Sequence, residues 1–220
     1  MKTIKIAAAL AAMTIGAAAA GASQAATLVS DFTVDGASGG LGVASPYGEV
    51  TVNDAGGTLA FTVNLFDGLV FRNSPDTNHW SFTFDLNVAT ATIGSVADNG
   101  AGTFHAVAGP VAQKPFGSFE YVLDCNSGCS TGYNAASPTQ LTFVVSAPTT
   151  LTTGSIVPNS DGYLFAADVA NTGGATGNVA STGLKASVPE PASWAMMLVG
   201  FGGLGAVLRS KRRRQGFAAA

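Results

Sequence analysis

The chain has 220 residues and a formal net charge of −3, and only 10% of its residues are charged. It is rich in Gly, Thr, Ala, Val, Phe and Ser and poor in the Lys, Glu, Leu and Arg that fill helices, which argues against a helical fold. Residues 26–188 hold three basic residues against twelve acidic ones, a net charge of −9. Nucleic-acid binding through phosphate contacts is therefore excluded, because it needs clustered Lys and Arg.

The first 25 residues have the three regions of a secretory signal peptide. Lys2 and Lys5 form a positively charged start, residues 6–20 are uncharged, and residues 23–25 supply small side chains at the cleavage position. We therefore predict an N-terminal signal helix over residues 1–25, which is cleaved after Ala25 or one residue later. An uncleaved anchor is the alternative, and the small residues argue against it.

Residues 26–186 are expected to form one β-rich domain, because short apolar runs alternate with turn clusters throughout. In chain order, strands are predicted over residues 28–34, 49–53, 58–65, 69–72, 79–86, 89–95, 117–125, 140–147 and 163–169. The second and third of these flank residues 54–57 and predict a hairpin. Many short strands at such intervals predict an all-β body, an antiparallel sandwich or jelly roll.

The clearest strand pattern lies at residues 79–86. Trp80, Phe82, Phe84 and Leu86 alternate there with Ser81, Thr83 and Asp85. Strict alternation of this kind predicts a half-buried strand with its apolar side chains on one face and its polar side chains on the other.

Cys125 and Cys129 are the only cysteines. Two nearby cysteines in an exported chain predict one disulfide. A zinc site would need two further ligands, and neither histidine has ligand spacing to the cysteines, so no metal site is predicted. Asp124, Asn126 and Gly128 alternate as in a calcium loop, but the acid that completes an EF-hand loop is missing, which favours a simple turn.

Catalytic motifs are scarce. Residues 36–40 read Gly-Ala-Ser-Gly-Gly, which fits the nucleophile-elbow pattern, but no helix start follows as that motif requires. His79 and His105 are interpreted as structural or surface residues. Four carboxylates are candidates for a glycosidase pair, although the sequence alone brings no two of them together: Asp85, Glu120, Asp124 and Asp168. Four tyrosines are candidates for carbohydrate contacts or for core packing: Tyr47, Tyr121, Tyr133 and Tyr163.

The C-terminal segment, residues 187–214, has three parts in order. Pro189-Glu190-Pro191 is stiff and extended, because proline cannot continue a helix N-terminally. Residues 192–208 are uncharged and would span about 25 Å as a helix, which predicts a short transmembrane helix. A basic cluster follows, and since positive residues stay cytoplasmic, the body lies on the other side of the membrane. The cluster consists of Arg209, Lys211, Arg212, Arg213 and Arg214.

Together with Trp194 and Ala195, this order of motif, apolar span and basic end resembles the PEP-CTERM sorting signal of Gram-negative bacteria, in its Pro-Glu-Pro-x-x-Trp-Ala form. The resemblance implies that exosortase, a membrane protease-transpeptidase, recognises and cuts the tail. The inner membrane is then a transient partner and exosortase is the processing partner. A simple membrane anchor with incidental prolines is the alternative interpretation.

The body is similar to a recurring type of PEP-CTERM cargo domain over residues 80–85, 116–125, 141–145, 165–169 and 176–179. This resemblance implies a secreted β domain and supplies no catalytic residue or cofactor. We therefore expect a non-catalytic cell-surface or extracellular-matrix protein, with exopolysaccharide as a candidate partner. One alternative is a secreted polysaccharide hydrolase that uses two of the carboxylates. A second is an ice- or surface-binding protein, since the same tail occurs on some ice-binding proteins, but the threonines lack a fixed period.

Overall fold

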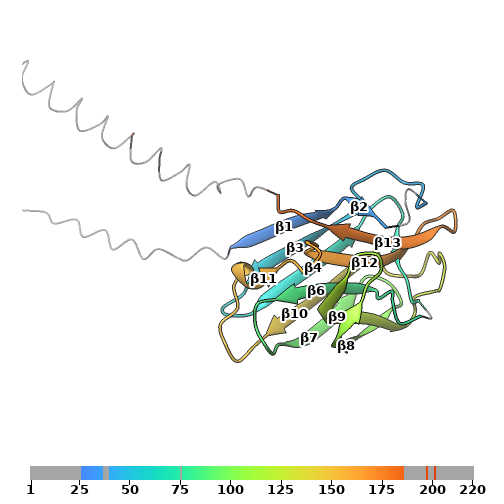
Figure 1. The fold of residues 1–220 in the computed structure, drawn as a ribbon. Helices are drawn as coiled ribbons and strands as arrows, with labels where there is room; N and C mark the ends of the chain where they lie inside the picture. Colours follow the sequence, from blue (N-terminus) through green and yellow to red (C-terminus); the bar gives the residue numbers. More distant parts are fainter. Residues whose placement is uncertain (1–25, 37–39, 75, 186–196, 198–200, 202–220) are drawn as a thin grey trace, which may run out of the picture.

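The computed structural model describes residues 26–36, 40–74 and 76–185, with the isolated positions 197 and 201. The described chain forms two antiparallel sheets that pack face to face (Figure 1). The predicted signal helix, residues 1–25, lies outside the described residues, as does the predicted transmembrane helix, residues 192–208, apart from Met197 and Phe201.

Thirteen strands and one 3-10 turn make up the described fold. They are β1 (Thr27–Phe32), β2 (Val34–Asp35), β3 (Gly48–Asp54), β4 (Leu59–Leu65), β5 (Val70–Phe71), β6 (Phe82–Leu86), β7 (Thr92–Asp98), β8 (Thr103–Ala112), β9 (Ser118–Ser127), β10 (Gln140–Ser146), η1 (Thr153–Ser155), β11 (Ile156–Val157), β12 (Phe165–Ala170) and β13 (Thr176–Ser181). The five-stranded sheet has the order β1-β3-β4-β10-β7. The eight-stranded sheet has the order β2-β13-β12-β6-β9-β8, with β11 beside β6 and β5 beside β12.

Phenylalanines from both sheets fill the space between them. Phe61 of β4 stacks on Phe143 of β10 in the same sheet, with ring centroids 4.6 Å apart. Across the interface, the Phe61 ring lies 4.9 Å from Phe84 of β6 and 6.4 Å from Phe165 of β12. All four rings are buried. Aromatic pairs add to the gain from burying their area, so this group joins the two sheets.

The outer face of the eight-stranded sheet is covered as well. Phe116 and Phe119, at the tip of the β8–β9 hairpin, pack on Ala166 and Ala180 as a second apolar cluster. The hairpin reaches this position because β9 pairs with β6 only up to Tyr121 and β8 carries a register shift between Ala108 and Val111. A bulge of this kind bends a strand, and here the tip folds back over the sheet.

This covering changes the environment of β6. The alternation is confirmed, since Phe82, Phe84 and Leu86 are buried in the main core. The expectation of a half-buried strand was wrong, because Ser81 and Thr83 on the other face are both 0% exposed. Trp80 also departs from the pattern: it precedes β6, lies outside the core cluster, and its indole N–H donates to Ala112 O over 3.1 Å.

Most of the other predicted strands are present, with three differences. The expected strand at 28–34 is broken at Thr33, where the chain leaves the five-stranded sheet and pairs with β13. The strand expected at 89–95 begins later, as β7. The sequence predicts no bounded strand over residues 103–112 or 176–181, where β8 and β13 lie. Both are short of large apolar residues, so pairing with β9 and β12 selects their conformation.

We expect Phe61→Ala in the body, residues 26–185, to lower the free energy of unfolding by about 3–5 kcal/mol, because it removes the ring that contacts both sheets and leaves a cavity. Urea denaturation followed by intrinsic fluorescence measures the loss. Thr150→Ala, at an exposed position, is the control and should change stability by less than about 0.5 kcal/mol. Equal effects of the two substitutions would contradict the assignment of the core.

Candidate functional site

The segment that follows β13 is held by hydrogen bonds and ion pairs beside β1, the first strand of the body. Residues 182–185 run antiparallel to β1: Ser30 Oγ donates to Gly183 O, and Lys185 N donates to Val29 O over 2.8 Å. The Lys185 ammonium lies 2.8 Å from both Asp31 Oδ1 and Glu49 Oε2. The hydrogen bonds that this ammonium donates to Asp31 and Glu49 raise the pKa of Lys185. We call residues 182–185 the bracket.

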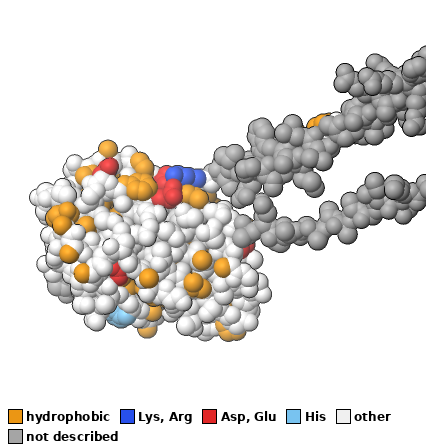
Figure 2. Space-filling view, turned by 180° about the vertical axis from the view of Figure 1, so that it is seen from behind, with side chains coloured by type: hydrophobic (Ala, Val, Ile, Leu, Met, Phe, Trp, Pro, Cys, Tyr) orange, Lys and Arg blue, Asp and Glu red, His pale blue; other side chains and the backbone are white. Residues whose placement is uncertain are grey.

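Basic side chains are rare on the surface of the body. On the face shown in Figure 2, blue appears in one small area, directly beside red carboxylates. Only three basic residues occur between residues 26 and 188, and Lys185 is one of them. The last described part of the body is thus fixed by one of its few available cations.

Beneath the hairpin tip lies a buried polar network. Asp168 of β12 is 0% exposed, and the Arg72 guanidinium contacts it at 3.0 Å. Burial raises the pKa of Asp168 to about 6, and the opposing attraction of Arg72 is the smaller effect. Arg72 Nε also donates to Thr131 O, which ties β12 to the loop that follows the disulfide. Gln113, in the loop between β8 and β9, completes this network: its Oε1 accepts a hydrogen bond from Trp80 N over 2.7 Å.

The four candidate carboxylates are distributed along this outer face, and three of them serve the fold. Asp168 is paired with Arg72, Asp124 accepts from Ser81 Oγ over 3.2 Å, and Asp85 Oδ1 accepts from Glu120 N over 2.6 Å. Burial raises the pKa values of Asp85 and Asp124, and the Glu120 charge adds to the rise at Asp85. Only Asp85 and Glu120 are thus brought together, and only Glu120 is exposed.

Neither histidine lies in a catalytic arrangement that the structure describes. His79 Nδ1 is 2.8 Å from Asp76 Oδ2 at the surface, and His105 is exposed on β8 opposite Asp124. Among the described residues, no three His, Cys, Asp or Glu side chains cluster closely enough to hold a metal ion. In the elbow-like pattern at 36–40, the central Ser38 lies outside the described residues.

The four tyrosines do not form an exposed platform in the described part of the chain. Tyr47 and Tyr121 are each 8% exposed and belong to the main core. Tyr163 packs its ring on Phe116, with centroids 4.8 Å apart, and Tyr133 is half-buried. Core packing is therefore the role that these contacts support for three of them.

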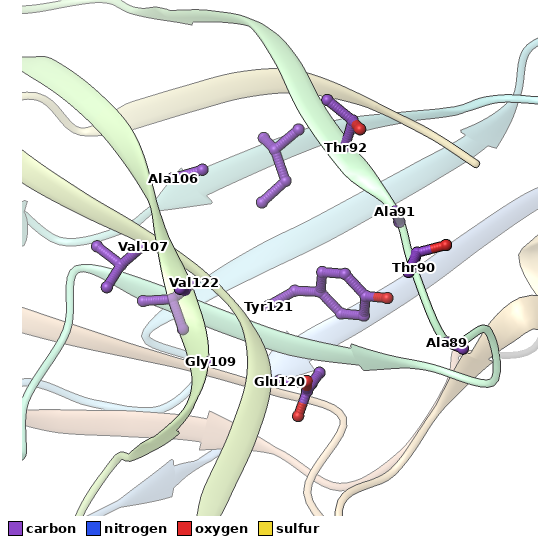
Figure 3. A pocket seen from close by; sticks show the side chains of 12 residues that line it. Ala89, Thr90, Ala91, Thr92, Ala106, Val107, Gly109, Glu120, Tyr121 and Val122 are labelled. Atoms are coloured by element: carbon purple, nitrogen blue, oxygen red, sulfur yellow. The ribbon is translucent and has the colours of Figure 1, made fainter. Parts of the chain in front are cut away.

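An apolar groove that the sequence did not predict lies where the edges of the two sheets meet. Strands β7, β8 and β9 line it, together with residues 89–91, and its volume is 360 Å³ (Figure 3). Tyr121 points into it, and its hydroxyl donates to Val88 O over 3.0 Å. The groove exists because Ala106 and Ala108 of β8, opposite Leu123 and Tyr121, are too small to fill the edge. Isolated alanines in a strand give no signal of this in the sequence.

The predicted sorting residues Pro189, Glu190, Pro191, Trp194 and Ala195 and the basic residues of 209–214 lie outside the described residues. Among the described positions no helix is long and apolar enough to cross a membrane. Comparison with known families bears on this segment directly: a family model described as the PEP-CTERM protein-sorting motif matches residues 187–214. The chain carries a PEP-CTERM sorting motif. No curated protein and no solved structure matches the chain.

A PEP-CTERM protein is exported and processed by exosortase, and the β-rich body is consistent with a cargo domain of this class. The matched segment begins two residues after Lys185, so the sorting motif follows the bracket almost directly. The bracket therefore fixes the place on the body where the described chain ends, two residues before the motif begins.

The predicted disulfide is confirmed. Cys125, at 0% exposure in β9, is bonded to Cys129, with the two Cα atoms 6.1 Å apart. Gly128 within the loop has φ +82°, and a Cβ there would lie 1.8 Å from Ala101 O, so only glycine allows this close approach. Disulfides form and persist in oxidising compartments outside the cytoplasm, so this disulfide agrees with the export of the protein. The turn expected at residues 124–128 is not formed: Asp124 and Asn126 belong to β9, and only Gly128 lies in a bend after it. Asp124 accepts a hydrogen bond from Ser81 Oγ.

We expect Asp168→Asn to change how stability depends on pH. Because the folded-state pKa of about 6 lies above the ordinary value of 3.8, the folded protein binds the proton more tightly than the unfolded chain. The stabilisation from this group is fully present below pH 3.8 and is lost as pH rises through 6. Relative to the variant, the wild type should lose about 3 kcal/mol across this window, measured by denaturation at successive pH values.

Asp161→Asn is the matched control, since it makes the same chemical change at an exposed carboxylate. If Asp168→Asn and the wild type show parallel profiles between pH 4 and 7, Asp168 does not titrate in this range and the assignment is wrong.

Proposed function

We propose that this protein is a non-catalytic component of the cell surface or extracellular matrix, with exopolysaccharide as its candidate partner. The signal peptide is removed after export, and the tail, with its transmembrane segment 192–208, holds the body at the inner membrane until exosortase processes it. The match of residues 187–214 to the sorting motif carries the sorting part of this proposal.

The non-catalytic part is supported by how the carboxylates are used. Asp168 is buried with Arg72, and Asp124 and Asp85 accept hydrogen bonds that join neighbouring strands. A retaining or inverting glycosidase needs two carboxyl groups that both reach the substrate. Three of the four candidates are committed to the fold, which leaves Glu120 as the exposed one.

One observation favours a hydrolase as the second candidate function. Asp85 and Glu120 are neighbours, burial raises the pKa of Asp85, and Glu120 is exposed beside the groove of Figure 3. A carboxylic acid with a raised pKa beside a second carboxyl group is the combination found in glycosidases. However, Glu120 lines this groove and Asp85 does not, so only one carboxylate of the pair faces it.

Replacing Pro189-Glu190-Pro191 with three alanines should leave an unprocessed form in the membrane fraction of a host that has exosortase, because the recognised element is gone. Immunoblots of membrane and extracellular fractions measure this, and N-terminal sequencing checks that cleavage after Ala25 is unchanged. Alanines in place of Pro148, Thr149 and Thr150, three exposed residues of the body, are the control. An unaltered processed fraction in the first variant would remove the motif from the mechanism.

We expect the purified body, residues 26–185, to release no reducing sugar from a panel of polysaccharides and to be retarded by host exopolysaccharide in affinity electrophoresis. Turnover that Glu120→Gln abolishes would establish the hydrolase and overturn the proposal. Glu120→Asn serves as a second variant, since it shortens the side chain as well as removing its charge. Retardation without turnover supports a matrix role.

A further inference from the structure

The direction in which the chain leaves the body is defined by the bracket. Gly183 lies beside Ser30, and Lys185 lies beside Val29, so the chain runs back along β1 toward Thr27. Thr27 pairs with Asn53 at the end of β3, directly before the turn at residues 55–58. Both ends of the described body therefore point toward one end of the sandwich, on the side of β1 in Figure 1.

Three neighbouring segments form this end, and we call them the near rim: residues 55–58, 87–91 and 147–154. Leu151 N donates to Gly57 O over 3.0 Å, and Asn87 N donates over 2.9 Å to the carbonyl of Ser155, the residue directly after the third segment, so the three segments are neighbours. The near rim contains no Asp, Glu, Lys or Arg. Many of its residues are exposed, including Ala55, Thr90 and Thr150. Asp54, which borders it, accepts from Thr153 N over 2.6 Å.

The opposite end of the sandwich differs in charge. Strand β4 runs from Leu59 at the near rim to Leu65 at the far end, about 20 Å away. Asp67 is exposed in the turn after β4, and Asp98 ends β7 there. The two acidic residues that precede rim segments in the chain, Asp54 and Asp85, are half-buried and accept hydrogen bonds from Thr153 N and Glu120 N. The rim segments themselves are uncharged, whereas Asp67 is exposed at the far end.

Chain length places this neutral rim close to the membrane in the precursor. Only residues 186–191 separate Lys185 from the predicted start of the transmembrane segment at 192. At about 3.5 Å per residue, even a fully extended chain would span roughly 25 Å between Lys185 and residue 192. A body with a net charge of −9 is repelled by anionic headgroups, and a neutral surface meets them with the least repulsion.

We propose that the near rim is the surface that the precursor turns toward the headgroups of the membrane, and that the bracket enforces this orientation. The proposal rests on the membrane-held precursor put forward above. The sorting motif is then presented between the rim and the lipid surface, and the far end, with Asp67 and Asp98, faces away from the membrane.

Energy transfer in reconstituted vesicles tests the orientation. The exported precursor, residues 26–220, is inserted into phosphatidylethanolamine–phosphatidylglycerol vesicles that contain acceptor-labelled headgroups. A donor is attached at Thr150→Cys on the near rim or, as the matched control, at Thr172→Cys in the exposed turn after β12. We expect transfer from position 150 to be at least twice as efficient as from position 172. Equal or reversed efficiencies in vesicle-bound protein overturn the orientation while leaving membrane anchoring intact.

Two further measurements separate the causes. Precursor that fails to co-sediment with the vesicles overturns the anchoring and the orientation together. Inserting twenty Gly and Ser residues after Lys185 should remove the difference between the two positions, because a flexible linker of this length adds roughly 25 Å of reach. If the difference in transfer efficiency persists with the linker, the bracket is not its cause. If the difference appears only when exosortase is co-reconstituted, the near rim contacts the enzyme and not the lipid, and the proposal is overturned.

Discussion

The packing of phenylalanine rings between two sheets is the constraint on which the rest of this structure depends. Phe61 contacts rings from both sheets, so it determines how β4 and β10 lie over β6 and β12. Once those strands are placed, the flanking strands can only add at their edges. The polar network, the groove and the bracket are all consequences of this central arrangement, since each is built from strands that the core has already positioned.

The outer face of the eight-stranded sheet shows how the fold accommodates charge. An isolated carboxylate is costly to bury, and Asp168 is fully buried. Arg72 offsets part of that cost, and the raised pKa of Asp168 shows that burial remains the larger effect. The same guanidinium holds the loop after the disulfide, so one of the few cations in the body joins three segments. Its role is architectural, because it holds a buried carboxylate and a loop in place.

Export and fold meet at the bracket. Both ends of the body cross from one sheet to the other. From β1 of the five-stranded sheet the chain continues into β2, beside β13 of the eight-stranded sheet, and the segment after β13 returns beside β1. The described chain of the body therefore ends at a fixed place on the sandwich, two residues before the sorting motif begins. The uncharged near rim and the far end, with Asp67 and Asp98, give the body two unlike ends.

Local features of the sequence determined the class of the protein and its destination. The alternation at β6, the turn at residues 54–57, the spacing of Cys125 and Cys129 and the sorting motif all lie within short stretches, and short-range geometry is enough to specify them. Tertiary structure decided what long-range contacts control. Arg72 and Asp168 lie 96 residues apart, and Lys185 and Glu49 lie 136 apart. Ser81 is buried where its hydroxyl donates to Arg72 O and to Asp124, which come from other segments. The groove depends on Ala106 and Ala108 lying opposite Leu123 and Tyr121. Sequence periodicity tells which face of a strand is apolar, but only the packing of distant segments decides what covers the other face.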